Sequence, residues 1–280
     1  MICNEFSNFL PNAEFSSHQL VLMPPIFPLE IEELILDLLA EGDASYSAIK
    51  TCSLVCQAFL PICRKHIFGS IFLNDYYCRK MPLSTIHAFA RLLRGTPEIA
   101  DYIRKLDYNL NILFTDLNSP SARESLKRIS RLESLTVWQK GWPNVDWSNN
   151  PIRPSLLHLL HLPTLTHFTV DINDFVLSDL IPCVNLKYLR IGNNMEVAAK
   201  STFPAALPEL SIQLDELVAD IMSPDAMMLC TARHPDGQPI FDFGSLSKIK
   251  VDLEGLNESE ALQELFGRCH VLTKAHISCM

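Results

Sequence analysis

Residues 132–137 read LESLTV and residues 165–170 read LTHFTV, and this six-residue pattern decides the fold. Positions one, four and six are apolar, so the second half alternates apolar and polar residues as a half-buried strand does. Five further segments share the pattern: residues 103–108, 186–191, 214–219, 246–251 and 272–277. Their central apolar positions, 106, 135, 168, 189, 217, 249 and 275, are 29, 33, 21, 28, 32 and 26 residues apart. The pattern predicts seven strands.

Helical stretches lie between several of these segments, at residues 122–131, 155–161 and 259–268. A strand followed by a helix that leads back to a parallel neighbour builds a parallel sheet backed by helices. The spacing brackets, with some overshoot, the leucine-rich period of about 20 to 29 residues. The usual turn Asn does not recur, so residues 103–280 are predicted to form an irregular leucine-rich-repeat-like solenoid within an α/β fold.

The N-terminal part of the chain carries helical patterns instead. Residues 1–23 mix Asn, Ser, Phe and Pro without a period and are predicted to form a flexible arm. Apolar residues recur at helical spacing from Pro28 until Gly42, and two further helices are expected before residue 68. We assign residues 24–73 to a small helical domain and residues 74–102 to a helical linker.

Composition and charge argue against several classes of protein. The 280 residues include 23 Lys and Arg against 32 Asp and Glu, a net charge of −9 without a basic run, so nucleic acid is not an expected partner. The closest glycines, Gly237 and Gly244, are too far apart for a dinucleotide-binding or P-loop motif. Neither a membrane span nor a signal peptide is visible, so we expect no membrane partner and a cytoplasmic or nuclear location.

The first helices resemble a known motif. Residues 27–31, FPLEI, then Ile35, and residues 54–59, LVCQAF, resemble the F-box, which runs Leu-Pro-x-Glu-Leu/Ile, an apolar residue, and later Val-Cys-x-x-Trp. The resemblance covers residues 24 to 73, with Phe27 in place of the leading Leu and Phe59 in place of the Trp. Residues 96–104 and the leucine-rich-like tail look most like fungal F-box proteins.

The resemblance implies a three-helix F-box that binds a Skp-type adaptor and, through it, a cullin. The following repeats would present a protein substrate to an SCF-type ubiquitin ligase, and the chain itself would have no catalytic site. The implied adaptor contacts are Phe27, Pro28, Glu30, Ile31, Ile35, Leu38, Val55, Cys56 and Phe59. The alternatives are that these residues are internal core, and that the chain is an interaction scaffold outside a ligase.

A thiol or zinc enzyme is the remaining alternative. Candidate metal ligands Cys52, Cys56, Cys63 and His66 lie on predicted helices, and the chain contains no C-x-x-C. We therefore expect buried thiols, no metal and no other cofactor. Cys269 with a neighbouring His is a conceivable catalytic pair, but no catalytic motif supports it.

Within each predicted strand, the residues between the apolar positions face away from the core. One column then holds Asp107, Thr136, Thr169, Arg190, Val218, Lys250 and His276, and a second holds Asn109, Trp138, Asp171, Gly192, Asp220, Asp252 and Ser278. All three tryptophans fall at residues 138–147, in a Pro- and Asn-rich stretch that predicts an exposed loop. The predicted substrate-binding residues are Trp138, Trp142, Trp147, Asp171 and Arg190. The alternative is a loop that folds back over one edge of the solenoid.

Overall fold

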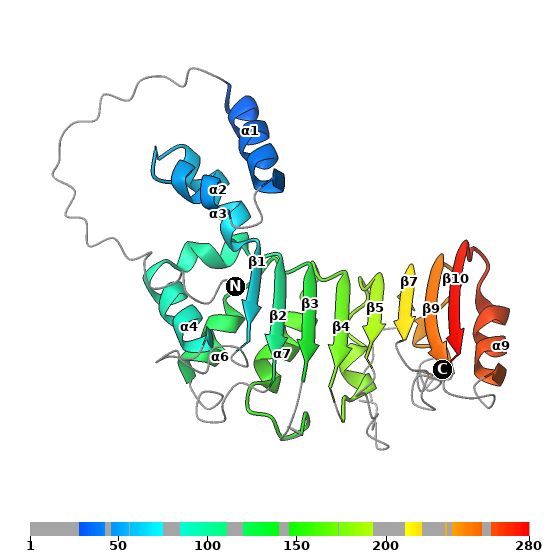
Figure 1. Cartoon of the computed structure of the whole chain (residues 1–280). Helices are drawn as coiled ribbons and strands as arrows, with labels where there is room; N and C mark the ends of the chain where they lie inside the picture. Colours follow the sequence, from blue (N-terminus) through cyan, green and yellow to red (C-terminus); the bar gives the residue numbers. More distant parts are fainter. Residues whose placement is uncertain are drawn as a thin grey trace, which may run out of the picture.

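The protein is described by a computed structural model as a row of parallel strands with helices behind it and a smaller helical unit at one end (Figure 1). The residues described are 28–42, 46–55, 57–74, 85–110, 120–139, 146–172, 174–192, 211–219, 233, 237–253 and 259–279. The predicted arm, Phe27, Cys56, Trp142 and Asp220 lie outside these residues.

The main sheet has eight strands, all parallel, in the order β1-β2-β3-β4-β5-β7-β9-β10. Their bounds are β1 Ser70–Leu73, β2 Lys105–Asn109, β3 Ser134–Trp138, β4 His167–Asp171, β5 Tyr188–Ile191, β7 Glu216–Ala219, β9 Lys248–Leu253 and β10 Lys274–Cys279. Seven of them are the predicted strands, so the α/β class and the strand positions are confirmed. The eighth, β1, lies at the end of the predicted helical domain and was not predicted.

The predicted alternation is confirmed from β2 to β9, whereas in the last strand, β10, the predicted core positions Ala275 and Ile277 are exposed. Leu106, Leu135, Phe168, Leu189, Leu217 and Ile249 pair in register, and all are buried in one core. The next residue along each strand points to the other side, so Asp107, Thr136, Thr169, Arg190, Val218, Lys250 and His276 form one register row. We call this side the open face of the sheet.

The start of each strand repeats one hydrogen-bonding arrangement. The Gly69 carbonyl accepts the backbone N–H groups of Arg104 and Lys105, both at 2.9 Å. Carbonyls at the same position before the next strands also accept two successive N–H groups from their neighbour. They belong to Arg104, Glu133, Thr166, Lys187, Asp215 and Ser247. This recurrence fixes one register along the whole sheet.

Helices cover the face opposite the open face and complete the core. They are α4 Thr85–Gly95, η2 Pro97–Tyr102, α6 Pro120–Lys127, α7 Arg153–Leu160, η3 Leu177–Leu180 and α9 Ser259–Arg268. Phe89 of α4 and Leu126 of α6 are fully buried in the same cluster as the strand residues. A two-stranded parallel sheet, β6 Ile212–Gln213 with β8 Phe241–Asp242, adds Ile212 and Phe241 to this core. The helices of the predicted linker thus share the core of the sheet.

The N-terminal unit consists of α1 Leu29–Gly42, α2 Ser47–Cys52 and α3 Phe59–Phe68, and it stands above β1 in Figure 1. Its own core is small: Leu36, Ile49, Ile62 and Cys63. Ile67 packs against both this cluster and the core of the sheet. Arg64 Nη1 lies 3.1 Å from Glu98 Oε1 on η2, so α3 is tied to the sheet by packing and by an ion pair.

Candidate interaction surfaces

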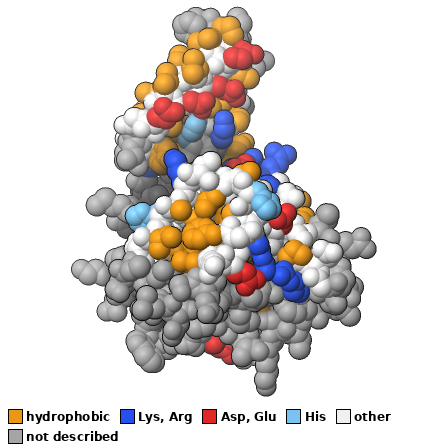
Figure 2. All heavy atoms as spheres, turned by 90° about the vertical axis from the view of Figure 1, so that its right-hand side faces the viewer, with side chains coloured by type: hydrophobic (Ala, Val, Ile, Leu, Met, Phe, Trp, Pro, Cys, Tyr) orange, Lys and Arg blue, Asp and Glu red, His pale blue; other side chains and the backbone are white. Residues whose placement is uncertain are grey.

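The helices of the N-terminal unit leave large aliphatic side chains exposed. Leu38 is 59% exposed and Leu54, in the turn after α2, is 84% exposed. We call the whole set the apolar helix face: Leu29, Ile31, Leu34, Ile35, Leu38, Leu39, Leu54 and Val55. Figure 2 shows hydrophobic side chains beside acidic ones on this part of the molecule. An apolar area of this extent on one small unit is typical of a docking surface.

The charges on α1 are of one sign. Helix α1 carries five acidic residues and no basic one: Glu30, Glu32, Glu33, Asp37 and Glu41. Asp37 Oδ1 lies 2.8 Å from His66 Nε2 on α3, a distance that makes an ion pair when the imidazole is protonated. The other four carboxylates lie on α1 beside its aliphatic side chains and make this helix negatively charged.

The structure places most of the predicted adaptor contacts on this surface. Six of the described ones are exposed: Pro28, Glu30, Ile31, Ile35, Leu38 and Val55. Phe59 is half-buried, because its ring packs against the small core of the unit. Unlike those six residues, Phe59 therefore contributes mainly to internal packing. Sequence analysis did not select Leu34 and Leu54, although their apolar character at helical spacing was visible.

A second surface lies on the open face at the β1 end of the sheet. Trp138 on β3 donates its indole Nε1–H to Asp107 Oδ1 on β2, and its ring centroid lies 6.3 Å from that of Phe72 on β1. Phe72 is 42% exposed. Burial raises the pKa of the Asp107 carboxyl above its usual 3.8, and the hydrogen bond from Trp138 acts in the opposite direction. We call Phe72, Asp107 and Trp138 the aromatic–acid cluster.

The other predicted open-face residues lie further along the sheet. Asp171 pairs in register with Trp138, and its side chain fills the space where a Cβ on Gly192 would stand, at 2.4 Å. Arg190 on β5 is exposed, two strands from Trp138. Beyond it the face becomes cationic with Lys248, Lys250 and Lys274. Glu216 Oε2 lies 3.2 Å from the Lys248 ammonium at this end. Sequence reasoning thus grouped Trp138 correctly with Asp171 but missed Phe72, because it did not expect β1.

The prediction of an exposed, substrate-binding Trp147 is wrong. Its side chain is 1% exposed and lies 5.7 Å from Phe175 between ring centroids. Its Nε1–H donates to Asp179 Oδ2 at 2.8 Å, and Arg153 Nη2 donates to Asp179 Oδ1 at 2.7 Å. Trp147 therefore anchors the segment before α7 against η3, and the Pro- and Asn-rich composition around it gave no sign of this partner.

The described cysteines have the environments of packing residues. Cys63 and Cys183 are buried, and Cys52 and Cys269 are half-buried. Burial, with the nearby charge of Asp179, raises the pKa of Cys183 to about 12, so this thiol stays protonated. Burial also raises the pKa of Cys269. Within the described ranges, His, Cys, Asp and Glu side chains form no group of three that could hold a metal ion.

No protein-family model matches the chain, and no curated protein is significantly similar to it. In the part of the chain that the structure describes, no helix is both long and apolar enough to cross a bilayer. The roles of the two surfaces are therefore argued from their own geometry.

Proposed function

We propose that the chain is an F-box substrate-recognition subunit, in which residues 24–73 bind a Skp-type adaptor and residues 103–280 form a leucine-rich-repeat-like solenoid that presents a target. The single observation that carries this proposal is the apolar helix face. Its members lie on α1 and after α2, the segments that carry the F-box resemblance. The recurring hydrogen bonds at the strand starts support the repeat character of the second part.

Energetics favour a partner over bare exposure. Full burial of an aliphatic side chain is worth about 1.5–3 kcal/mol, so covering the exposed half of each contributes about 1 kcal/mol. Six such side chains on α1 and two after α2 together provide enough for a specific complex after the cost of association. Among the described residues, the core of the unit has four buried side chains, too few to account for the retention of so much apolar surface around it.

The catalytic chemistry in this proposal belongs to the ligase. Binding of both adaptor and target places the target near the ubiquitin-transferring enzyme, which raises its effective concentration there. The open face of the sheet suits the second task, because its side chains take no part in the core and can vary without loss of fold. The ion pair of Arg64 with Glu98, and the packing of Ile67, would hold target and adaptor in one orientation.

Co-purification with a Skp-type adaptor tests the proposal. The variants are Leu34→Asp and Leu54→Asp, since both side chains are more than half exposed and their replacement leaves the core intact. We expect wild type to retain the adaptor and both variants to lose it, because a carboxylate would be buried unpaired at the interface. Val271→Asp is the matched control: Val271 is also an exposed aliphatic residue, but it lies beside β10 at the other end of the sheet.

The outcomes separate the candidates. A ligase subunit is supported if wild type and the control retain both adaptor and cullin and the two variants retain neither. Adaptor retained without cullin supports an interaction scaffold outside a ligase. No adaptor bound by a folded wild type, or equal binding by all variants, refutes the F-box assignment.

A further inference from the structure

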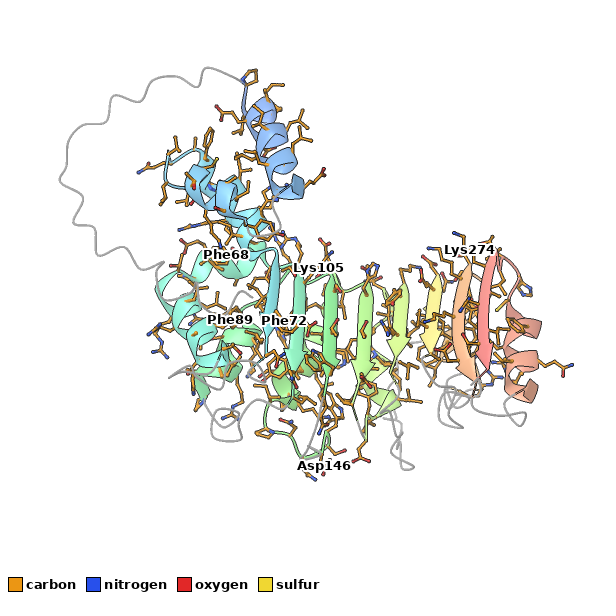
Figure 3. All side chains as sticks on the ribbon, in the orientation of Figure 1. Phe68, Phe72, Phe89, Lys105, Asp146 and Lys274 are labelled. Carbon is orange, nitrogen blue, oxygen red and sulfur yellow. The ribbon has the colours of Figure 1, made fainter. Side chains whose placement is uncertain are left out.

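The aromatic–acid cluster combines groups from three neighbouring strands. Phe72, Asp107 and Trp138 come from β1, β2 and β3, so the carboxylate lies on the strand between the two aromatic residues. Figure 3 places Phe72 at the outer edge of the sheet, on the strand that follows the N-terminal unit. The cluster therefore stands next to the proposed adaptor-binding unit and is not covered by a described helix.

No basic side chain of the described ranges forms an ion pair with the carboxylate of this cluster. Among the described residues, the only donor to the Asp107 carboxylate is the neutral indole of Trp138. Lys105, two residues earlier on the same face of β2, makes no ion pair with it within the described part of the chain. Partly buried carboxylates are normally paired with a cation, and Trp138 supplies only a neutral donor.

We propose that Phe72, Asp107 and Trp138 form a receptor for one lysine or arginine side chain of a target protein. The carboxylate would accept hydrogen bonds from the ammonium or guanidinium group at Asp107 Oδ2, since Oδ1 is engaged by Trp138. The aromatic faces would hold the aliphatic stem and attract the charge by cation–π interaction. That the cation belongs to a ligase target rests on the proposed function, but binding of the side chain needs no adaptor.

The partner's chemistry follows from the polarity of the open face. Its β1 end offers two aromatic rings and the Asp107 carboxylate, with Lys105 two residues away on β2, whereas its other end offers Lys248, Lys250 and Lys274. Figure 3 shows how far apart Phe72 and Lys274 lie along the sheet. An anionic side chain would be repelled at the β1 end, and a neutral apolar one would leave the carboxylate desolvated and unpaired. A cationic side chain alone satisfies both the rings and the acid.

The indole N–H of Trp138 reports on this site directly, because it is hydrogen-bonded to the carboxylate. The experiment is an NMR titration of the ¹⁵N-labelled full chain, whose three tryptophans each give an indole signal. The Trp138→Phe variant assigns the relevant one. The probes are the blocked tripeptides acetyl-Gly-Arg-Gly-amide and acetyl-Gly-Lys-Gly-amide, with Gln and Glu in the central position as neutral and anionic controls.

We expect saturable shifts of the Trp138 signal with the Arg and Lys peptides, at dissociation constants of about 1–10 mM, and none with Gln or Glu. Asp107→Asn should weaken binding about tenfold or more while preserving the acceptor for Trp138. Asp252→Asn is the matched control, because Asp252 is a half-buried acid of the same face on β9 and should leave the affinity unchanged.

Three results would overturn the proposal: no saturable shift in a folded wild type, an equal response to the Gln peptide, or unchanged affinity in Asp107→Asn. Because adaptor is absent from the titration, failure here is distinct from failure of the F-box assignment. A protein that binds the adaptor but not the cationic peptides keeps the proposed function and loses this receptor.

Discussion

The sharpest prediction concerns Trp147, which the sequence pattern placed on the surface and the structure places in the core. Trp147→Ala removes an indole that is 1% exposed and packed against Phe175. Large aromatic-to-alanine replacements in cores cost about 3–5 kcal/mol through lost burial and the cavity left behind. The lost hydrogen bond to Asp179 is part of this cost, about 1 kcal/mol, because Arg153 still pairs with that carboxylate at 2.7 Å. We expect a loss of about 4 kcal/mol.

Two further substitutions divide this cost. Trp147→Phe keeps an aromatic ring but removes the Nε1–H donor, so it should cost about 1–2 kcal/mol. Trp138→Ala is the matched control, because this indole lies on the open face and contributes little to the core; its loss should be about 1 kcal/mol. A typical free energy of unfolding is about 5–15 kcal/mol, so Trp147→Ala would reduce it greatly and Trp138→Ala would change it little.

Urea unfolding followed by far-ultraviolet circular dichroism measures these differences, since fluorescence would lose its own reporter. Shifts of the midpoint at constant denaturant dependence give the change in the free energy of unfolding. If Trp147→Ala costs no more than Trp138→Ala, the burial of Trp147 and its role as an anchor of α7 and η3 are refuted.

Two other predictions concern stability. Burial raises the pKa of Asp107, so the folded protein binds this proton more tightly than the unfolded chain does. The free energy of unfolding therefore falls as the pH rises from 3.8 through the raised pKa of the folded state. Asp107→Asn should therefore match or exceed wild type in urea unfolding at neutral pH; a clearly less stable variant contradicts this. Gly69→Ala should cost about 1–3 kcal/mol, because its Cβ would stand 2.6 Å from the Lys65 carbonyl oxygen; an unchanged thermal midpoint would contradict it.

The strands were predictable because their signal is local. Each needs apolar residues at fixed intervals of two and three, and a parallel sheet of similar units then puts equivalent positions side by side. That reasoning predicts that Asp107 and Arg190 lie in one register row, as they do in the structure. The short strand β1 carries the same pattern, with Phe68, Ile71 and Leu73 at the apolar positions, but it was missed because Phe68 also ends the predicted third helix.

The candidate surfaces were predictable only in part. The exposed positions of α1 follow from a helix whose apolar residues are spread too widely for one core, and the F-box resemblance pointed to the same segment. Phe59 was placed at the surface by that resemblance, yet the structure packs it against the core of the unit. A motif specifies residue types, whereas exposure depends on how the helices cross.

The sequence by itself determined the positions of seven strands, the alternation from β2 to β9 and the acidic character of α1, because periodicity and charge are properties of neighbouring residues. The tertiary structure decided which distant residues meet. Trp147 finds Asp179 at a separation of 32 residues, and the aromatic–acid cluster draws on three strands. Such contacts depend on the length of each connection and on the register it imposes, and neither is written in a local pattern.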